Sequence, residues 1–81
     1  MADLTEVKRL VEAALPGSEV GVTDLTGGGD HLAIVVTAPQ FVGVGLIDQH
    51  RMIHAALARK MPPVSDEIHA LQIKTVVPPN P

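Results

Sequence analysis

The stretch from Phe41 to Thr75, FVGVGLIDQHRMIHAALARKMPPVSDEIHALQIKT, decides the fold of this chain. Its middle part, Leu46–Lys60, repeats apolar residues at the spacing of an α-helix. The helix is expected to end at Met61-Pro62-Pro63, because proline lacks an amide hydrogen and is poorly tolerated inside a helix. Alternation of apolar and polar residues over Ile68–Val76 then predicts a strand. The stretch therefore predicts a helix that crosses over the sheet and is followed by a short strand.

The residues before this stretch predict one helix followed by two strands. Apolar residues recur at helical spacing over Leu4–Leu15, and Asp3 begins a capping-box pattern just before them. Strands are expected at Ser18–Leu25 and His31–Ala38, on either side of the glycine-rich loop Thr26–Asp30. No Gly-Lys-Ser/Thr and no helix follow this loop, so we expect a flexible hairpin loop rather than a phosphate site.

The predicted element order is αββαβ, which places the chain in the α+β class. The first two strands are expected to form an antiparallel hairpin. The third strand then lies parallel to the second after a right-handed crossover. Both helices cover one face of a three-stranded mixed sheet. We expect a single domain over residues 1–81, in which residues 76–81 form an extended tail that cannot continue a ladder.

Composition excludes several classes of function. The chain has 81 residues, no cysteine, one aromatic residue, Phe41, and a net charge of -3. Without cysteine it has no disulfide, thiolate ligand or cysteine nucleophile. We find no nucleophile–base set and expect no catalytic activity. No apolar run reaches the roughly 18–20 residues of a membrane span, and no signal-peptide pattern opens the sequence, so we expect a cytoplasmic protein.

Two of the four histidines lie on the predicted second helix. His50 and His54 stand one helical turn apart, a spacing that suits a shared metal ion. His50, however, falls within the apolar stripe of Leu46, Ile53 and Leu57. We therefore predict that His50 is a packed, structural histidine.

The other two histidines, His31 and His69, stand at the starts of the predicted second and third strands. Neighbouring strands lie about 4.8 Å apart, so both imidazoles can reach one site at this edge of the sheet. Strict alternation nevertheless places His69 on the face of Leu71 and His31 on the face opposite Leu32. The pattern alone leaves two interpretations open: a shared metal site, or two ordinary surface histidines.

The chain resembles the BolA family. The segments QHRMIHAAL and EIHALQIKT occur in the order and spacing of that family, preceded by GGDHLAIVV and an F-x-G at Phe41. The resemblance extends from Leu4 to Thr75 and implies a fold similar to class II KH domains. Family members usually carry a further short helical turn, giving αββααβ, which is expected near Val42–Gly45 or in the connector at Pro62.

The resemblance also implies a partner and a cofactor. BolA-like proteins pair with monothiol glutaredoxins and share a bridging [2Fe–2S] cluster, in cluster trafficking or iron-responsive regulation. The family's third-strand histidine matches His69, its expected iron ligand, and His31 is the nearest match to a second ligand. The glutaredoxin cysteine and glutathione then complete the set. Two histidines cannot hold such a cluster alone, so we expect the isolated chain to carry none. We also expect the isolated chain to be a monomer or a weak dimer.

An alternative implied by the KH-like fold is a nucleic-acid-binding transcriptional regulator. Its surface is expected at Gly43, Gly45 and Arg51. Many family members carry a basic run in this region, which apolar and acidic residues dilute here. Since binding to DNA without sequence preference rests on basic residues, the net charge of -3 predicts weak DNA binding.

Overall fold

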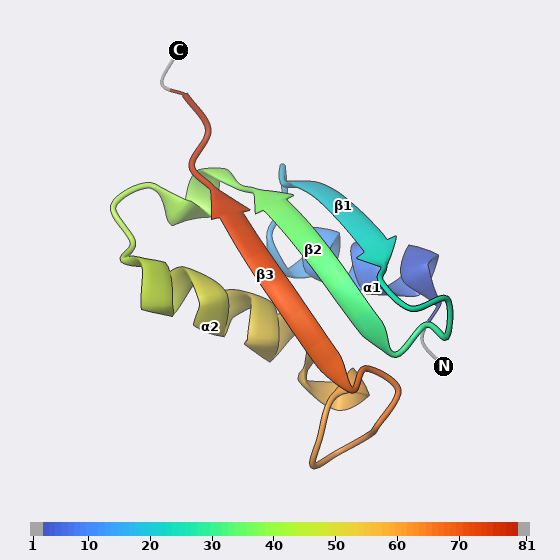
Figure 1. Cartoon of the computed structure of the whole chain (residues 1–81). Coiled ribbons are helices and arrows are strands. Elements are labelled where there is room, and N and C mark those ends of the chain that lie inside the picture. Colours follow the sequence, from blue (N-terminus) through green and yellow to red (C-terminus); the bar gives the residue numbers. More distant parts are fainter. Residues whose placement is uncertain (1–2, 80–81) are drawn as a thin grey trace.

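A computed structural model describes residues 3–79 of the chain (Figure 1). Its elements are, in order, α1 (Leu4–Ala14), β1 (Glu19–Asp24), β2 (His31–Thr37), η1 (Pro39–Phe41), α2 (Leu46–Leu57), η2 (Ala58–Lys60) and β3 (Ala70–Val76). The predicted αββαβ order and α+β class are confirmed. The additional helical turns are the 3-10 segments η1 and η2, which both lie slightly earlier in the chain than expected.

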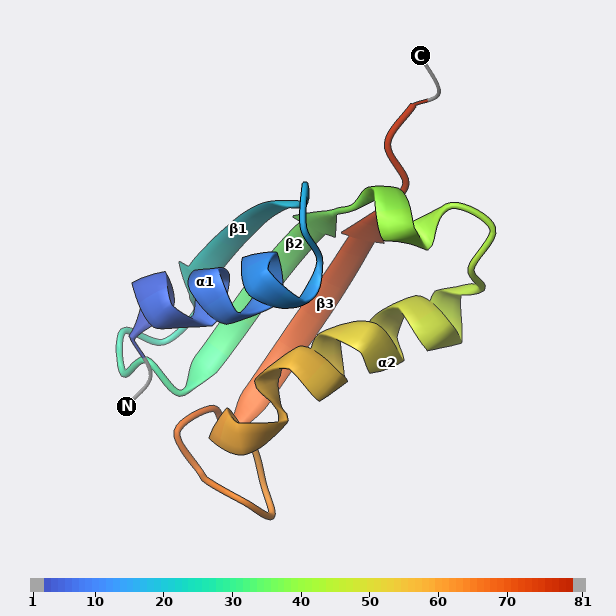
Figure 2. The same ribbon diagram turned by 180° about the vertical axis from the view of Figure 1, so that it is seen from behind.

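The sheet has the strand order β1-β2-β3. β1 pairs with β2 antiparallel, with Glu19 opposite Thr37, and β2 pairs with β3 parallel, with His31 opposite Ala70. Figures 1 and 2 show both α-helices on one face of the sheet, and within the described part of the chain no α-helix lies on the other face. The predicted mixed sheet with helices on one face is therefore confirmed. Among residues 3–79, no helix has the length and apolar character needed to cross a membrane.

The core lies between the sheet and the two α-helices. Alternate residues of β2 point into it, as the sequence predicts, and the only aromatic residue, Phe41, is fully buried beside them. The buried side chains are Val7, Val11, Leu15, Val20, Leu32, Ile34, Val36, Ala38, Phe41, Ile53, Leu57 and Ile68. The core is thus aliphatic around a single ring, and its burial supplies the main stabilisation of the fold.

Helix α1 differs from its prediction in two details. The Asp3 carboxylate caps the helix, but it accepts from the amide of Thr5 at 2.9 Å rather than from that of Glu6. The Glu6 side chain forms an ion pair with Lys60 instead of closing a capping box. Ala14, expected on the apolar stripe, is exposed, whereas Val11 and Leu15 on either side of it are buried.

The prediction that His50 packs in the core is wrong. Gln49 is the buried residue of this turn, only 7% exposed, while His50 is half-buried and Leu46 is 63% exposed. The Gln49 amide nitrogen donates to the carbonyl of Val44 at 2.7 Å, and its amide oxygen accepts from the hydroxyl of Thr75. These hydrogen bonds satisfy the buried side chain of Gln49. The face of α2 that points into the core is therefore the one that carries Gln49, and His50 lies beside it.

The end of the chain follows the prediction only in part. Val76 belongs to β3, so the extended tail begins at Val77, and residues 77–79 form no regular element. The remaining two residues of the predicted tail lie outside the described residues. At the other end of β3, the strand begins at Ala70 rather than at Ile68.

Candidate metal centre

The parallel pairing of β2 with β3 brings the starts of both strands to one edge of the sheet. At this edge the carbonyl oxygen of Asp30 accepts two hydrogen bonds, from the amide of His69 at 2.6 Å and from the amide of Ala70 at 3.1 Å. A regular parallel ladder gives one amide to each carbonyl. The backbone therefore departs from the ladder at His69, and the alternation of the strand does not extend to it.

This departure brings the two imidazoles together. The ring centroids of His31 and His69 lie 6.0 Å apart, with the ring planes inclined at 38°. The His31 side chain is 43% exposed and His69 is exposed, so a second molecule has access to both rings. A metal–nitrogen bond of about 2 Å puts a ring centroid roughly 3 Å from the metal, so two rings on one metal have centroids within roughly 6 Å. The observed pair fits that requirement.

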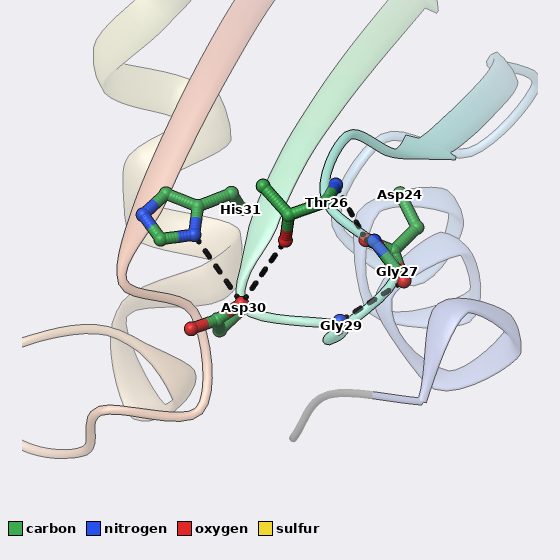
Figure 3. Close-up of polar contacts among 6 residues, drawn as sticks. All are labelled: Asp24, Thr26, Gly27, Gly29, Asp30 and His31. Atoms are coloured by element: carbon green, nitrogen blue, oxygen red, sulfur yellow. Dashed lines mark hydrogen bonds and ion pairs between the residues drawn. The ribbon is translucent and has the colours of Figure 1, made fainter.

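Asp30 contacts His31 as well as the His69 segment. Its Oδ1 lies 3.3 Å from His31 Nδ1 and accepts from the hydroxyl of Thr26 at 3.4 Å (Figure 3). Partial desolvation acts to raise the pKa of Asp30, but the contacts with His31, its own backbone amide and Thr26 together hold that pKa below its ordinary value. The carboxylate is therefore ionised at neutral pH, which makes it a hydrogen-bond acceptor for the His31 ring.

A second carboxylate organises the loop before β2. Asp24 accepts hydrogen bonds from the amides of Thr26 at 3.2 Å and of Gly27 and Gly29 at 2.9 Å each (Figure 3). Gly27 and Gly29 have φ values of +81° and +75°, which favour glycine. The predicted hairpin loop is confirmed, and these three loop amides are bonded to Asp24 rather than available to a phosphate. An aspartate side chain that accepts from the amide two residues further on forms an Asx turn, and Asp24 does so with Thr26.

The connector that carries His69 is anchored to α1. Lys60 Nζ lies 2.8 Å from a carboxylate oxygen of Glu6 and 3.4 Å from one of Glu67, and the Lys60 side chain is 16% exposed. The hydrogen bond with Glu6, opposed by desolvation, raises the pKa of Lys60 above its ordinary value. The Ile68 amide donates to the Lys60 carbonyl at 2.8 Å, and the Ile68 side chain is fully buried. These contacts fix the chain immediately before His69.

The residues of the alternative nucleic-acid surface lie elsewhere. Gly43 and Gly45 are exposed in the loop that precedes α2, beyond the ends of β2 and β3 rather than their starts. Arg51 is exposed and lies 3.4 Å from the carboxylate of Asp48. The loop with Gly43 and Gly45 therefore lies at the other end of these strands from His31 and His69. His54, on α2, is also exposed, and it does not form a three-residue metal group with them among residues 3–79.

The His31–His69 pair is incomplete as a metal site within one chain. Within residues 3–79, no three His, Asp or Glu side chains are grouped so that they can hold a metal ion. Two imidazoles supply half of the four protein ligands that a [2Fe–2S] cluster usually takes, and imidazoles do serve as ligands to such clusters. The donor set therefore fits a cluster that a second molecule helps to hold.

Comparison with known proteins assigns the family. Residues 14–80 match the family model described as BolA-like protein. Protein BOLA2 of Arabidopsis thaliana is 39% identical over 77 residues, which cover 89% of this chain and 78% of that protein. A bolA homologue from Coxiella burnetii has a TM-score of 0.76 at 32% identity, covering 96% of this chain and 94% of that chain. A BolA-like hypothetical protein, RP812 from Rickettsia prowazekii, has a TM-score of 0.71 at 31% identity, covering 96% and 97%.

These matches cover the mixed sheet, both helices and the histidine edge, and they define a BolA-like domain. The chain belongs to the BolA family, which is a family of regulatory and partner proteins rather than of enzymes.

Proposed function

We propose that this chain binds a monothiol glutaredoxin and shares a bridging [2Fe–2S] cluster with it, in cluster trafficking or iron-responsive regulation. Membership of the BolA family supports the proposal, because the family resemblance implies this partner and this cluster. The structural observation that carries it is the pair of accessible imidazoles, His31 and His69, with ring centroids 6.0 Å apart.

The need for a partner follows from the number of ligands. A [2Fe–2S] cluster is usually held by four protein ligands, and this chain has no cysteine to add to its two histidines. The missing ligands are thiolates from the glutaredoxin cysteine and from glutathione. When bound, such a cluster supplies a redox-active iron centre, and histidine in place of thiolate raises its reduction potential.

The roles of this chain are to present and orient ligands. His69 is exposed on a connector whose backbone is fixed by Asp30 and Ile68, and His31 begins a strand buried at its next residue, Leu32. Both rings are therefore attached to fixed backbone and are accessible to a second protein. A chain acting in this way has no catalytic activity of its own. We place it in the cytoplasm, where the glutathione pool supplies the additional thiol.

Reconstitution tests the proposal directly. The full chain is mixed with a monothiol glutaredoxin, glutathione, ferrous iron and sulfide without oxygen, and the products are separated by size before visible circular dichroism. We expect a complex containing both proteins with a cluster spectrum different from that of the glutaredoxin reconstituted alone. The chain treated alone is expected to stay colourless. A mixture that yields only the spectrum of the glutaredoxin, with this chain eluting separately, contradicts the proposal.

A further inference from the structure

We propose that Asp30 is the positioning residue of the histidine pair. Its carboxylate orients the His31 ring so that Nε2 is free to bind a metal, while its carbonyl holds His69 at the same edge. The inference deepens the proposed function and rests on it for the nature of the bound group.

The carboxylate determines which nitrogen of His31 is available. Asp30 Oδ1 lies 3.3 Å from Nδ1, and an ionised carboxylate can only accept a hydrogen bond. Nδ1 of the neutral ring must therefore carry the proton, which leaves the lone pair on Nε2. A histidine that binds a metal through one nitrogen commonly donates the other N–H to a carboxylate, which fixes the ring and increases its basicity.

The carboxylate is itself held in place. The Thr26 hydroxyl donates to the same Oδ1 at 3.4 Å, and Thr26 lies in the loop whose amides converge on Asp24 (Figure 3). The Asp30 side chain is 41% exposed, so it is supported from the loop side while remaining partly open to solvent. The orientation of His31 thus depends on a chain of contacts that begins in the hairpin loop.

The carbonyl of Asp30 acts on the second histidine. It accepts from the amides of His69 at 2.6 Å and Ala70 at 3.1 Å, which brings the His69 ring alongside that of His31. Because this acceptor belongs to the main chain, it persists when the side chain is replaced. Substitution of Asp30 therefore removes the carboxylate contacts and leaves the anchoring of β3 intact.

The first test is the tautomer of His31 in the isolated chain, measured by ¹⁵N NMR of the imidazoles at pH 8. In the wild-type protein we expect mainly the form protonated at Nδ1. Asp30→Ala should lose this preference, and Asp30→Asn should retain part of it because an amide oxygen still accepts. Asp66→Ala is the matched control, since Asp66 is an exposed carboxylate on the connector before His69. Its loss should leave the tautomer unchanged.

The second test uses Zn²⁺ alone as the metal probe, followed through the ring resonances of His31 and His69. Loss of a carboxylate that supports a metal-binding histidine commonly lowers affinity about 10–100-fold, and we expect Asp30→Ala to do so. Asp66→Ala should change the affinity less than about twofold, which is small on that scale. Thr26→Val, which removes only the hydroxyl donor, should weaken binding in the same direction and by less, and it provides a second variant should Asp30→Ala fold poorly.

Any one of three results overturns the inference. The first is an unchanged His31 tautomer in Asp30→Ala, and the second is an unchanged zinc affinity in that variant. The third is the absence of a saturable effect of zinc on either ring of the wild-type chain. None of these measurements uses the glutaredoxin. Failure of cluster reconstitution together with the expected tautomer and zinc results therefore refutes the proposed function alone. A cluster that forms with a wild-type spectrum while the tautomer is insensitive to Asp30 refutes the positioning role alone.

Discussion

The ring centroids of His31 and His69 lie 6.0 Å apart, although strand alternation assigns the two side chains to opposite faces of the sheet. The contradiction disappears because β3 begins at Ala70, so His69 belongs to the connector and its side chain turns towards His31. One edge of the molecule therefore offers both rings to a single bound group.

Substitution of His69 tests this arrangement. His69→Ala should leave the fold intact because the side chain is exposed, and it should remove the circular dichroism of the cluster shared with glutaredoxin. His31→Ala is expected to have a smaller effect on that spectrum. His54→Ala, an exposed histidine on α2, is the matched control. A wild-type spectrum at wild-type affinity from the His69 variant shows that His69 is not a ligand.

Gln49 should matter more for stability than its neighbour His50. Gln49→Ala removes a buried side chain that bonds to Val44 and Thr75, and leaving those partners unsatisfied should cost about 1–3 kcal/mol of unfolding free energy. His50→Ala, at a half-buried position, should cost less than about 1 kcal/mol. Urea denaturation of both variants measures the difference. The reverse order of stabilities would restore the packed-histidine interpretation.

The histidine pair and Gln49 show which features of the structure the sequence predicts and which it does not. Helical and alternating periodicity predicts the element order and the sheet. The parallel crossover predicts that His31 and His69 lie at the same edge of the sheet, although β3 itself begins one residue after His69, at Ala70. Hydropathy did not identify Gln49 as buried, because its burial depends on hydrogen bonds to Val44 and Thr75. For the same reason periodicity does not predict the carboxylate contacts of Asp24 and Asp30, which depend on the folded loop.

Phe41 should be the most sensitive position in the core. Phe41→Ala removes the only aromatic side chain from a fully buried site and should lower the unfolding free energy by about 3–5 kcal/mol. The adjacent Val42 is 55% exposed, and Val42→Ala should change it by no more than about 0.5 kcal/mol. Chemical denaturation followed by far-ultraviolet circular dichroism compares the two. Similar losses for both would place Phe41 outside the core.

The Lys60 ion pairs should make stability depend on pH in the alkaline range. The pKa of Lys60 is raised above its ordinary value of 10.5 by Glu6 and Glu67, so its charged form favours the folded state. The stabilisation is fully present below pH 10.5 and is lost as the pH rises through the folded-state pKa. The melting temperature of the wild type should exceed that of Lys60→Met at pH 8, and the gap should narrow above pH 10.5. A gap independent of pH would assign the effect to packing of the side chain.

DNA binding should be weak. With a net charge of -3 and Arg51 close to Asp48, the surface around Gly43 and Gly45 provides few cations for phosphate contacts. Titration of a labelled duplex at about 0.15 M salt should give a dissociation constant of about 10⁻⁶ M or weaker, the range of non-specific binding. Arg51→Ala should lower this binding further if contact is made there. Tight, sequence-selective binding at that salt concentration would favour the regulator over the cluster-sharing protein.

The pairing of β2 with β3 also has a consequence for how the chain folds. The β1–β2 hairpin joins segments that are close in sequence, whereas β3 reaches β2 only after α2 and the connector have closed a long loop. Closing that loop costs entropy, so the parallel pairing is expected late in folding. The two imidazoles meet only once the last strand has docked. A partner that binds both imidazoles therefore binds only the folded chain and stabilises the folded state by mass action. It does not bind chains in which β3 has not yet paired with β2.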